Sequence, residues 1–240
     1  MPETFLTLLV AHLVADFPFQ PDWMIHHKKR PYVLALHTVI VVAMAALALG
    51  AIPLALLAIL GITHLAMDSL KAYALGDSLR SFLIDQAVHV GVILGLAYTF
   101  PYITQGGWWD QHAGSAPSTY YAGLCLLSGL ILSIRVGAIL IRKATAPFTN
   151  QIPTDIEGLT QGGYYIGCLE RALVMLLVLI GQPEGIAFLV TAKSILRFGE
   201  IKDSQQRKLT EYIIIGNFMS FGWGLLIALG TQCAVRYWWP

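Results

Sequence analysis

The 240-residue chain has little charge: only 12% of its residues are Asp, Glu, Lys or Arg, about half the share of an ordinary soluble domain. Acidic and basic residues nearly cancel, to a formal net charge of +1, and there is no basic tail or arm. This balance excludes nucleic acid as a partner, because phosphate binding needs a clustered basic surface. The three cysteines, Cys125, Cys168 and Cys233, are far apart, so neither a disulfide framework nor a thiolate zinc site is indicated.

Long apolar runs are abundant instead, and 56% of the residues are hydrophobic. Runs of roughly 17 to 25 apolar residues can cross a bilayer as helices. We predict an all-α, polytopic transmembrane helical bundle that forms a single integral membrane domain over 1–240. Residues 1–100 form a four-helix half with His and Asp, and 120–240 a second half with buried Glu, Arg and Lys. The predicted helices lie near 3–19, 32–49, 52–71, 82–100, 120–141, 164–180, 186–198 and 213–233. These are about eight spans, or seven if the short run 186–198 does not cross.

Basic residues follow every second predicted helix, in the segments 28–30, 71–80, 142–143 and 197–208, and are absent from 50–51, 101–119 and 181–185. Positive residues accumulate in cytoplasmic loops. We therefore expect both termini on the non-cytoplasmic side of a membrane. Trp108 and Trp109, in an outer loop, are expected at the level of the lipid headgroups.

Ionisable side chains within the apolar runs are ordered. His12 with Asp16, and His64 with Asp68, are spaced i,i+4 in the first and third runs, and the fourth run has the reverse order, Asp85 then His89. This spacing places both members on one helix face. With the predicted orientation, each Asp lies nearer the cytoplasm and each His one turn deeper, while His37 in the second run falls between these layers.

A charged group inside a membrane has a high free-energy cost, so its presence there suggests a functional role. Four imidazoles and three carboxylates at one depth are a ligand set for Zn, or for Mn or Fe, with enough groups for two ions. Some of them could instead orient a ligating His from outside the coordination sphere. The alternative is a set of His–Asp hydrogen bonds that hold helices together. The predicted metal ligands are His12, His37, His64, His89, Asp16, Asp68 and Asp85, and the three aspartates are also the catalytic candidates.

The second half contains further intramembrane charge. Lys193 and Arg197 are spaced i,i+4 and cannot neutralise each other, so they need acidic partners or an anionic ligand. Two interpretations of these charges remain: they form ion pairs that stabilise the structure, or they bind a phosphate or carboxylate group of a ligand. The candidate substrate-binding residues are Glu170, Arg171, Lys193, Arg197 and Glu211.

These motifs resemble a family of bacterial inner-membrane proteins known as domain of unknown function 3307. The likeness rests on the stretches 12–20, 36–37, 64–71 and 85–89, which contain the His and Asp pairs, and on a second block with 166–171, 192–198 and 211–212. The resemblance implies a multi-pass protein of the bacterial inner membrane and carries no assigned activity. A looser likeness, resting on His and Asp four residues apart near helix ends, is to bacterial membrane-bound metal-dependent hydrolases.

The favoured function is a membrane-embedded metal-dependent hydrolase whose site lies near the cytoplasmic face and takes a lipid or another phosphate-containing substrate. One alternative is a metal-ion or proton transporter or channel. Another is a structural or partner-binding membrane protein with a polar core. Zinc is the favoured cofactor, membrane lipids are the expected partners, and a homo-oligomer is compatible with the sequence.

Overall fold

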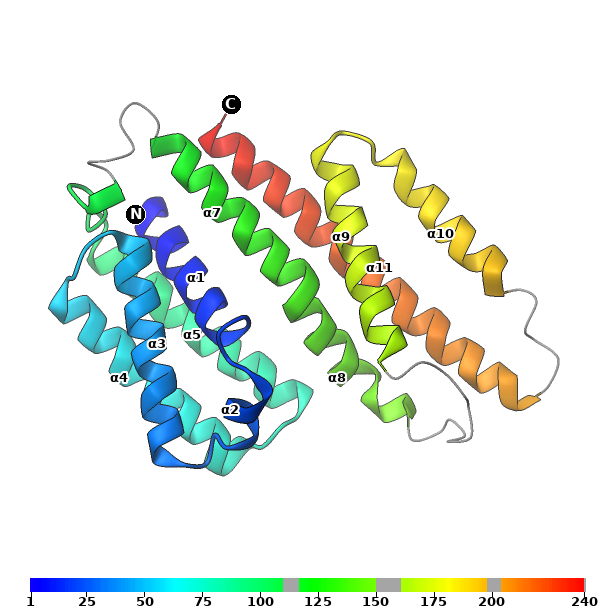
Figure 1. Cartoon of the computed structure of the whole chain (residues 1–240), viewed down its shortest axis with the longest axis horizontal. Coiled ribbons are helices and arrows are strands. Elements are labelled where there is room, and N and C mark those ends of the chain that lie inside the picture. The colour runs from blue at the N-terminus through cyan, green and yellow to red at the C-terminus, as the bar shows by residue number, and fades with distance from the viewer. Residues whose placement is uncertain (110–116, 150–160, 198–203, 240) are drawn as a thin grey trace. The chain divides into compact units, whose positions relative to one another are not determined.

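The computed structural model describes residues 1–109, 117–149, 161–197 and 204–239. Every element in these ranges is a helix (Figure 1), which confirms the predicted all-α class. The chain divides into two compact units, Met1–Ile131 with Ala234–Pro240, and Leu132–Cys233. The single membrane domain with halves 1–100 and 120–240 stays a prediction.

The first unit is built around its N-terminal helix. Helix α1 packs against α3, α5 and α7, and α4 packs between α3 and α5. A π-helical turn, η1, continues α4 directly. The elements are α1 (Pro2–Asp16), α2 (Asp22–His26), α3 (Pro31–Leu49), α4 (Leu54–Leu70), η1 (Lys71–Leu75), α5 (Leu79–Thr99) and α7 (Pro117–Ile131).

The second unit begins inside a long helix, because α7 continues through the π-helical turn η2 (Leu132–Val136) into α8 (Gly137–Thr149). It further contains α9 (Gly162–Leu179), α10 (Glu184–Arg197) and most of α11 (Ser204–Trp238). The predicted runs 120–141 and 213–233 are shorter than these helices. Hydropathy marks only the apolar part of a helix, whereas the backbone hydrogen bonds continue into polar residues at either end.

Among the described residues, six helical segments are long and apolar enough to cross a membrane. Helices α1 and α10 have 15 and 14 residues and are shorter than these candidates. At 1.5 Å per residue they measure about 22 Å, less than the roughly 30 Å of a hydrocarbon core. The six segments are Pro31–Leu49, Leu54–Leu75, Leu79–Thr99, Ser118–Thr149, Gly162–Leu179 and Lys208–Trp238.

The first unit has apolar side chains on its outside and ionisable ones within. Val39, Leu54 and Ile62 are 63%, 77% and 69% exposed, whereas His37 is fully buried and His64 is 2% exposed. Exposed apolar surface of this extent suits lipid better than water. The buried polar groups therefore need partners inside the protein.

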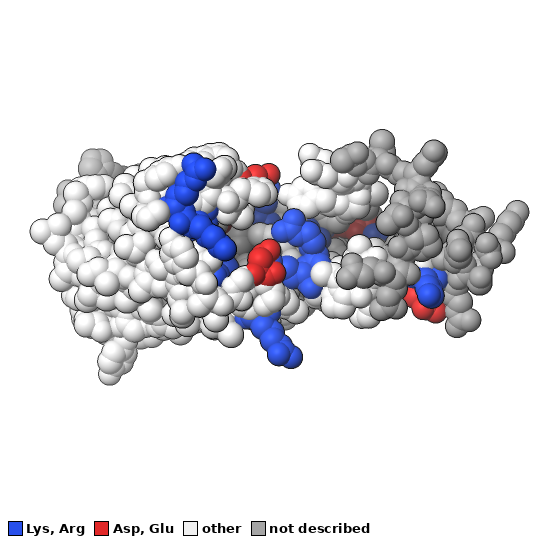
Figure 2. Space-filling model, turned by 90° about the horizontal axis from the view of Figure 1, so that it is seen from below, with Lys and Arg blue, Asp and Glu red and all other residues white. Residues whose placement is uncertain are grey.

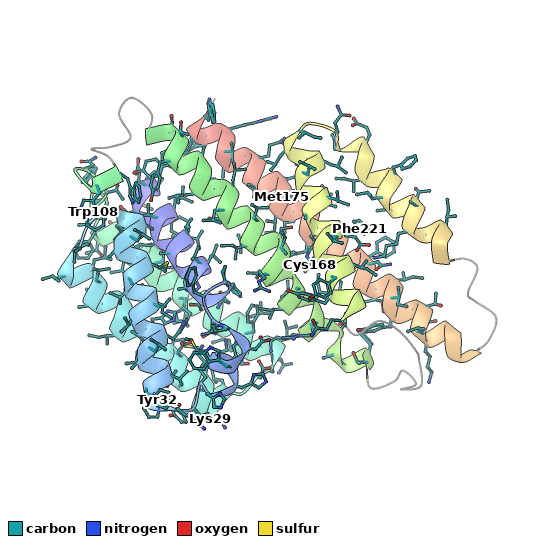
Figure 3. All side chains as sticks on the ribbon, viewed as in Figure 1. Lys29, Tyr32, Trp108, Cys168, Met175 and Phe221 are labelled. Atoms are coloured by element: carbon teal, nitrogen blue, oxygen red, sulfur yellow. The ribbon has the colours of Figure 1, made fainter. Side chains whose placement is uncertain are left out.

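The end of α3 is fastened by aromatic residues. The chain leaves α3 through Gly50, whose φ of +66° is the left-handed conformation that glycine adopts without strain. The indole of Trp109 donates to the carbonyl of Leu47 at 2.6 Å, and the amide of Trp108 to that of Gly50 at 2.7 Å. The carbonyls that a helix end leaves without partners are thereby bonded. Figure 3 shows Trp108 at this end of the first unit, and Lys29 and Tyr32 at the opposite end.

Candidate metal centre

Four helices of the first unit bring all seven predicted ligands together. His12 and Asp16 lie in the last turns of α1, and His64 and Asp68 in the last turns of α4. Helix α3 starts at Pro31, a residue suited to the first helical position because it has no N–H to leave unbonded, and this places His37 in its second turn. Helix α5 starts behind a capping box of Ser78 and Ser81, which sets the position of Asp85 and His89.

Two imidazoles face each other at the centre of the cluster. Their Nε2 atoms, in His37 and His64, are 3.1 Å apart. Asp16 Oδ1 lies 3.4 Å from the His37 nitrogen and 3.5 Å from the His64 nitrogen. Asp68 Oδ2 lies 3.5 Å and 3.6 Å from the same two atoms. The side chains of these four residues are at most 7% exposed, so the group is enclosed by protein.

These distances match those between the ligands of a tetrahedral metal ion. Zinc binds nitrogen and oxygen at about 2.0 to 2.1 Å, so two tetrahedral ligands lie about 3.3 Å apart. The two imidazole nitrogens and either carboxylate oxygen form a triangle with sides of 3.1 to 3.6 Å. Three donor atoms could thus hold one ion with little movement.

The remaining ligands lie beside this group. His89 Nε2 is 3.4 Å from Asp85 Oδ1, and oxygens of Asp68 and Asp85 with a nitrogen of His89 lie within 4.8 Å of one another. The His89 ring stacks on that of His64, with centroids 4.2 Å apart. His12 Nδ1 lies 3.6 Å from Asp16 Oδ1. The cluster therefore offers more donor atoms than one ion uses.

Several buried atoms of the cluster have no hydrogen-bond partner among the described residues. Buried polar atoms are normally hydrogen-bonded, so a cluster of exceptions needs an explanation. A metal ion would supply it for the carboxylate oxygens and for His89 Nε2, whereas His37 Nδ1 lies across its ring from the nitrogen that faces His64. The unpartnered atoms of the cluster are His12 Nδ1, Asp16 Oδ1, His37 Nδ1, Asp68 Oδ2, Asp85 Oδ1 and His89 Nε2.

The outer oxygens of two carboxylates are held by lysines. Lys28 Nζ donates to Asp68 Oδ1 at 2.9 Å, and Lys71 Nζ to Asp85 Oδ2 at 2.6 Å. In both aspartates the other oxygen is the unpartnered one that faces a histidine. Each carboxylate is thus oriented from outside, with one oxygen left for an ion, as expected of groups that position metal ligands.

Sequence reasoning missed these lysines and Gln86 as parts of the site. Gln86 donates through Nε2 to Asp85 Oδ2 at 3.1 Å, and its Oε1 lies 3.3 Å from His12 Nε2. In the sequence, Lys71 follows Asp68 by three residues, and this spacing was the only signal that either lysine belongs to the site. Lys28 gave no signal, because it lies in a basic run that membrane orientation already explains. In that run, His26 and His27 bond through Nδ1 to backbone carbonyls of α2 and are not among the cluster residues.

The substrate-binding candidates lie in the second unit, where Glu170 and Lys193 form an ion pair at 2.5 Å. Arg171 is 3% exposed, and its guanidinium donates to the carbonyls of Ser133 and Ile134, at 2.7 and 3.1 Å, and to the Ser220 hydroxyl. These bonds fasten α9 to η2 and to α11. Glu211 lies in α11 with an exposed side chain, and the side chain of Arg197 lies outside the described residues. The clamp proposed from the sequence stays a prediction.

Comparison with protein families gives one match. Residues 4–108 match the model of a family described as protein of unknown function (DUF3307). Neither the curated proteins nor the solved structures contain a match to the chain. The matched residues include all seven predicted ligands, together with Lys28, Lys71 and Gln86, so the candidate metal centre lies wholly within the part of the chain that resembles this family.

Proposed function

We propose that this protein is a membrane-embedded, metal-dependent hydrolase whose first unit holds a divalent ion, with zinc favoured over Mn or Fe. The observation that carries the proposal is the convergence of His37, His64, Asp16 and Asp68 within 3.1 to 3.6 Å, with unpartnered oxygens turned inward. Nitrogen and oxygen donors in this mixture suit these metals, whereas carboxylates alone would favour Mg or Ca.

Charge also favours a cation in the cluster. Three carboxylates face two lysines, so one negative charge remains when the histidines are neutral. Asp16 is the carboxylate concerned, because its ion-pair partners within the described ranges are histidines: His12, His37 and His64. An uncompensated carboxylate in a low-dielectric interior is strongly unfavourable. A divalent ion beside Asp16 would remove that cost.

The donor set suits hydrolysis. When bound, a divalent ion such as zinc polarises a substrate oxygen and lowers the pKa of a coordinated water to about 7. Asp85 and His89 lie next to the His37–His64 group but are not part of the triangle of donor atoms that would hold the ion. One of them can accept a proton from the attacking water, while Lys71 and Gln86 hold Asp85 in place.

Access is proposed from the lysine end alone. Beyond the histidines, toward Trp108, the core is a tightly packed set of apolar residues, and the buried hydroxyls of Thr4 and Thr7 are bonded to backbone carbonyls. A transporter needs a path to both faces, so this packing favours an enzyme over a transporter. These core residues are Leu8, Ala11, Val41, Ala45, Leu49, Leu56, Leu57, Leu60, Ile93 and Leu96.

The proposed location is the bacterial inner membrane, crossed by about eight helices, with both termini on the non-cytoplasmic side. Two features support it: the six long apolar helices, and the placement of Lys29 and Trp108 at opposite ends of the first unit. With basic residues inside, the metal centre opens toward the cytoplasmic leaflet. Membrane lipids are the proposed partners, and their headgroups are the substrates within reach.

The first test is the metal content of the purified, detergent-solubilised protein, measured by mass spectrometry. Wild-type protein is expected to contain Zn, Mn or Fe in stoichiometric amount, and the double variant His64→Ala/Asp68→Ala to have lost it. A folded wild-type preparation that contains no metal and cannot be reloaded would refute the proposal. Hydrolysis of phosphoester and lipid substrates is then screened with the metal-loaded protein and the double variant side by side.

A further inference from the structure

Two lysines stand between the buried cluster and the outside of the first unit. The side chains of Lys28 and Lys71 are 14% and 21% exposed, whereas those of their partners Asp68 and Asp85 are 1% and 2% exposed. Each lysine therefore pairs with a buried carboxylate while its own side chain is partly exposed. Each lysine bonds to one oxygen of a carboxylate whose other oxygen would hold the metal.

The segments that carry the two lysines are fastened to each other. Lys28 follows α2, and Lys71 opens the π-helical turn η1, an irregularity that often occurs at functional sites. Tyr73 in η1 donates its hydroxyl to the carbonyl of Lys29 at 2.6 Å. Because oxygens of Asp68 and Asp85 lie within 4.8 Å of each other, the two ammonium groups flank one pair of neighbouring carboxylates.

Both ammonium groups keep unused binding capacity. An ammonium group has three N–H donors, and within the described part of the chain each of these two makes a single hydrogen bond, to a carboxylate oxygen. Lys71 also lies over the ring of Phe82, 5.6 Å from its centroid, which limits its movement. A metal ion bound to Asp68 and Asp85 would neutralise part of the negative charge that these carboxylates offer to the lysines. The lysines would then attract an anion more strongly.

The surroundings place this end at the level of lipid headgroups. Trp23, Tyr32 and Tyr73 are 49%, 60% and 59% exposed, and aromatic residues with a polar edge are typical of the membrane interface. Figure 3 shows Tyr32 beside Lys29 at this end of α3. Figure 2 views the unit from this end and shows Lys and Arg side chains, in blue, on it. A ligand can thus arrive from the leaflet or from the aqueous phase.

We infer that Lys28 and Lys71 form the binding site for the phosphate group of a phosphomonoester substrate, next to the metal centre. The inference rests on the proposed function and adds to it the substrate class and the residues that select it. Each ammonium group is paired with a carboxylate but has N–H donors left, so the two lysines can bond to separate oxygens of a terminal phosphate, and a monoester offers three unesterified oxygens where a diester offers two. The phosphate could belong to a lipid headgroup or to a soluble compound.

The first experiment measures binding of inorganic phosphate to the purified, metal-loaded protein by equilibrium dialysis. Lys28→Gln and Lys71→Gln are each expected to weaken binding about tenfold or more, because each removes a charge-assisted hydrogen bond. Lys29→Gln, which changes an exposed neighbour of the same charge, should bind like wild type. Equal phosphate affinity in all four proteins would overturn the inference.

A second measurement uses wild-type protein and so does not depend on the folding of a variant. Phosphate is expected to protect Lys28 and Lys71 from acetylation by an amine-reactive reagent, with Lys29 as the unprotected reference, as read by peptide mass spectrometry. Equal modification of all three with and without phosphate would contradict the inference. Metal analysis of the same sample separates the two proposals: metal present without protection refutes the lysine site alone, and metal absent refutes the proposed function.

The source of the phosphate is distinguished by reconstitution. Protein is placed in phosphatidylcholine vesicles with or without phosphatidic acid, a lipid monoester, and the acetylation of both lysines is compared. Protection by phosphatidic acid, absent with phosphatidylglycerol, a diester, would support a lipid monoester. Protection by soluble phosphate alone would support a soluble one, and protection by the diester to the same extent would contradict the preference for monoesters.

Discussion

His37 and His64 come from different helices and are 27 residues apart in sequence, yet their Nε2 atoms are 3.1 Å apart. Each nitrogen also lies within 3.6 Å of an oxygen of Asp16 and of Asp68. Two neutral imidazoles share at most one hydrogen bond at this contact, because only one can donate. With two carboxylates around them, an ion between the rings would satisfy all four groups at once.

Removal of either imidazole should therefore release the ion. His37→Ala and His64→Ala are each expected to lower metal affinity on the order of 100-fold or more, since even changes to residues that only orient a ligand cost 10- to 100-fold. Competition with a chelator measures the affinity. The matched control is His26→Ala, which removes a histidine bonded within α2 to the Asp22 carbonyl. Wild-type affinity in His64→Ala would exclude His64 as a ligand.

Gln86 should tune the centre without binding the ion. Its amide holds Asp85 Oδ2 and its oxygen faces His12 Nε2, so Gln86→Ala frees two neighbouring side chains at once. We expect metal affinity to fall about 10- to 100-fold while the stoichiometry at saturating metal stays that of wild type. Gln105→Ala, at an exposed position near the opposite end, serves as the control. Loss of stoichiometry in Gln86→Ala would instead make Gln86 a ligand.

Arg171 should matter for the stability of the second unit. Arg171→Met leaves the carbonyls of buried Ser133 and partly buried Ile134 without this donor, which we expect to cost about 3 kcal/mol or more in the free energy of unfolding. The fluorescence of Trp223, whose indole donates to the Leu132 carbonyl, follows this region during denaturation.

Two further variants test that explanation. Arg171→Lys should restore little, because one ammonium group cannot span the acceptors that the planar guanidinium reaches. The exposed Arg135 bonds to the Tyr164 hydroxyl, so Arg135→Met should change the free energy of unfolding by about 0.5 kcal/mol or less. Equal stability of Arg171→Met and wild type would show that these hydrogen bonds contribute nothing net.

Membrane orientation can be measured with single cysteines in a background where Cys125, Cys168 and Cys233 are replaced. Lys29 and Gln105 are both exposed, and Gln105 lies three residues before Trp108, which is at the opposite end of the first unit from Lys29; the variants are Lys29→Cys and Gln105→Cys. An impermeant thiol reagent applied to intact cells should label residue 105 and not residue 29, and disruption of the membrane should expose residue 29. The reverse pattern would place the metal centre toward the other leaflet.

The i,i+4 spacing by itself determined six of the seven members of the candidate site, and His37 was added by its depth in the second run. A helix presents residues four apart on one face, so His12 with Asp16, His64 with Asp68, and Asp85 with His89 had to point together in pairs. The reversed order in the fourth run matched an antiparallel helix. Composition likewise determined the all-helical class, because apolar runs of this length satisfy their backbone groups only as helices in lipid.

Only the tertiary structure showed which oxygen of each carboxylate bonds to a lysine and which one is left unpartnered. Lys28 lies 40 residues from Asp68 and Lys71 lies 14 residues from Asp85, separations at which no helical spacing predicts contact. The packing of the segment after α2 against η1 brings both ammonium groups to the outer oxygens, and so leaves the inner oxygens unpartnered. In the same way, only the packing of α9 against η2 and α11 gave Arg171 neutral acceptors in place of an acidic partner. Side-chain pairing across helices depends on register and rotation, which the hydropathy of each helix does not encode.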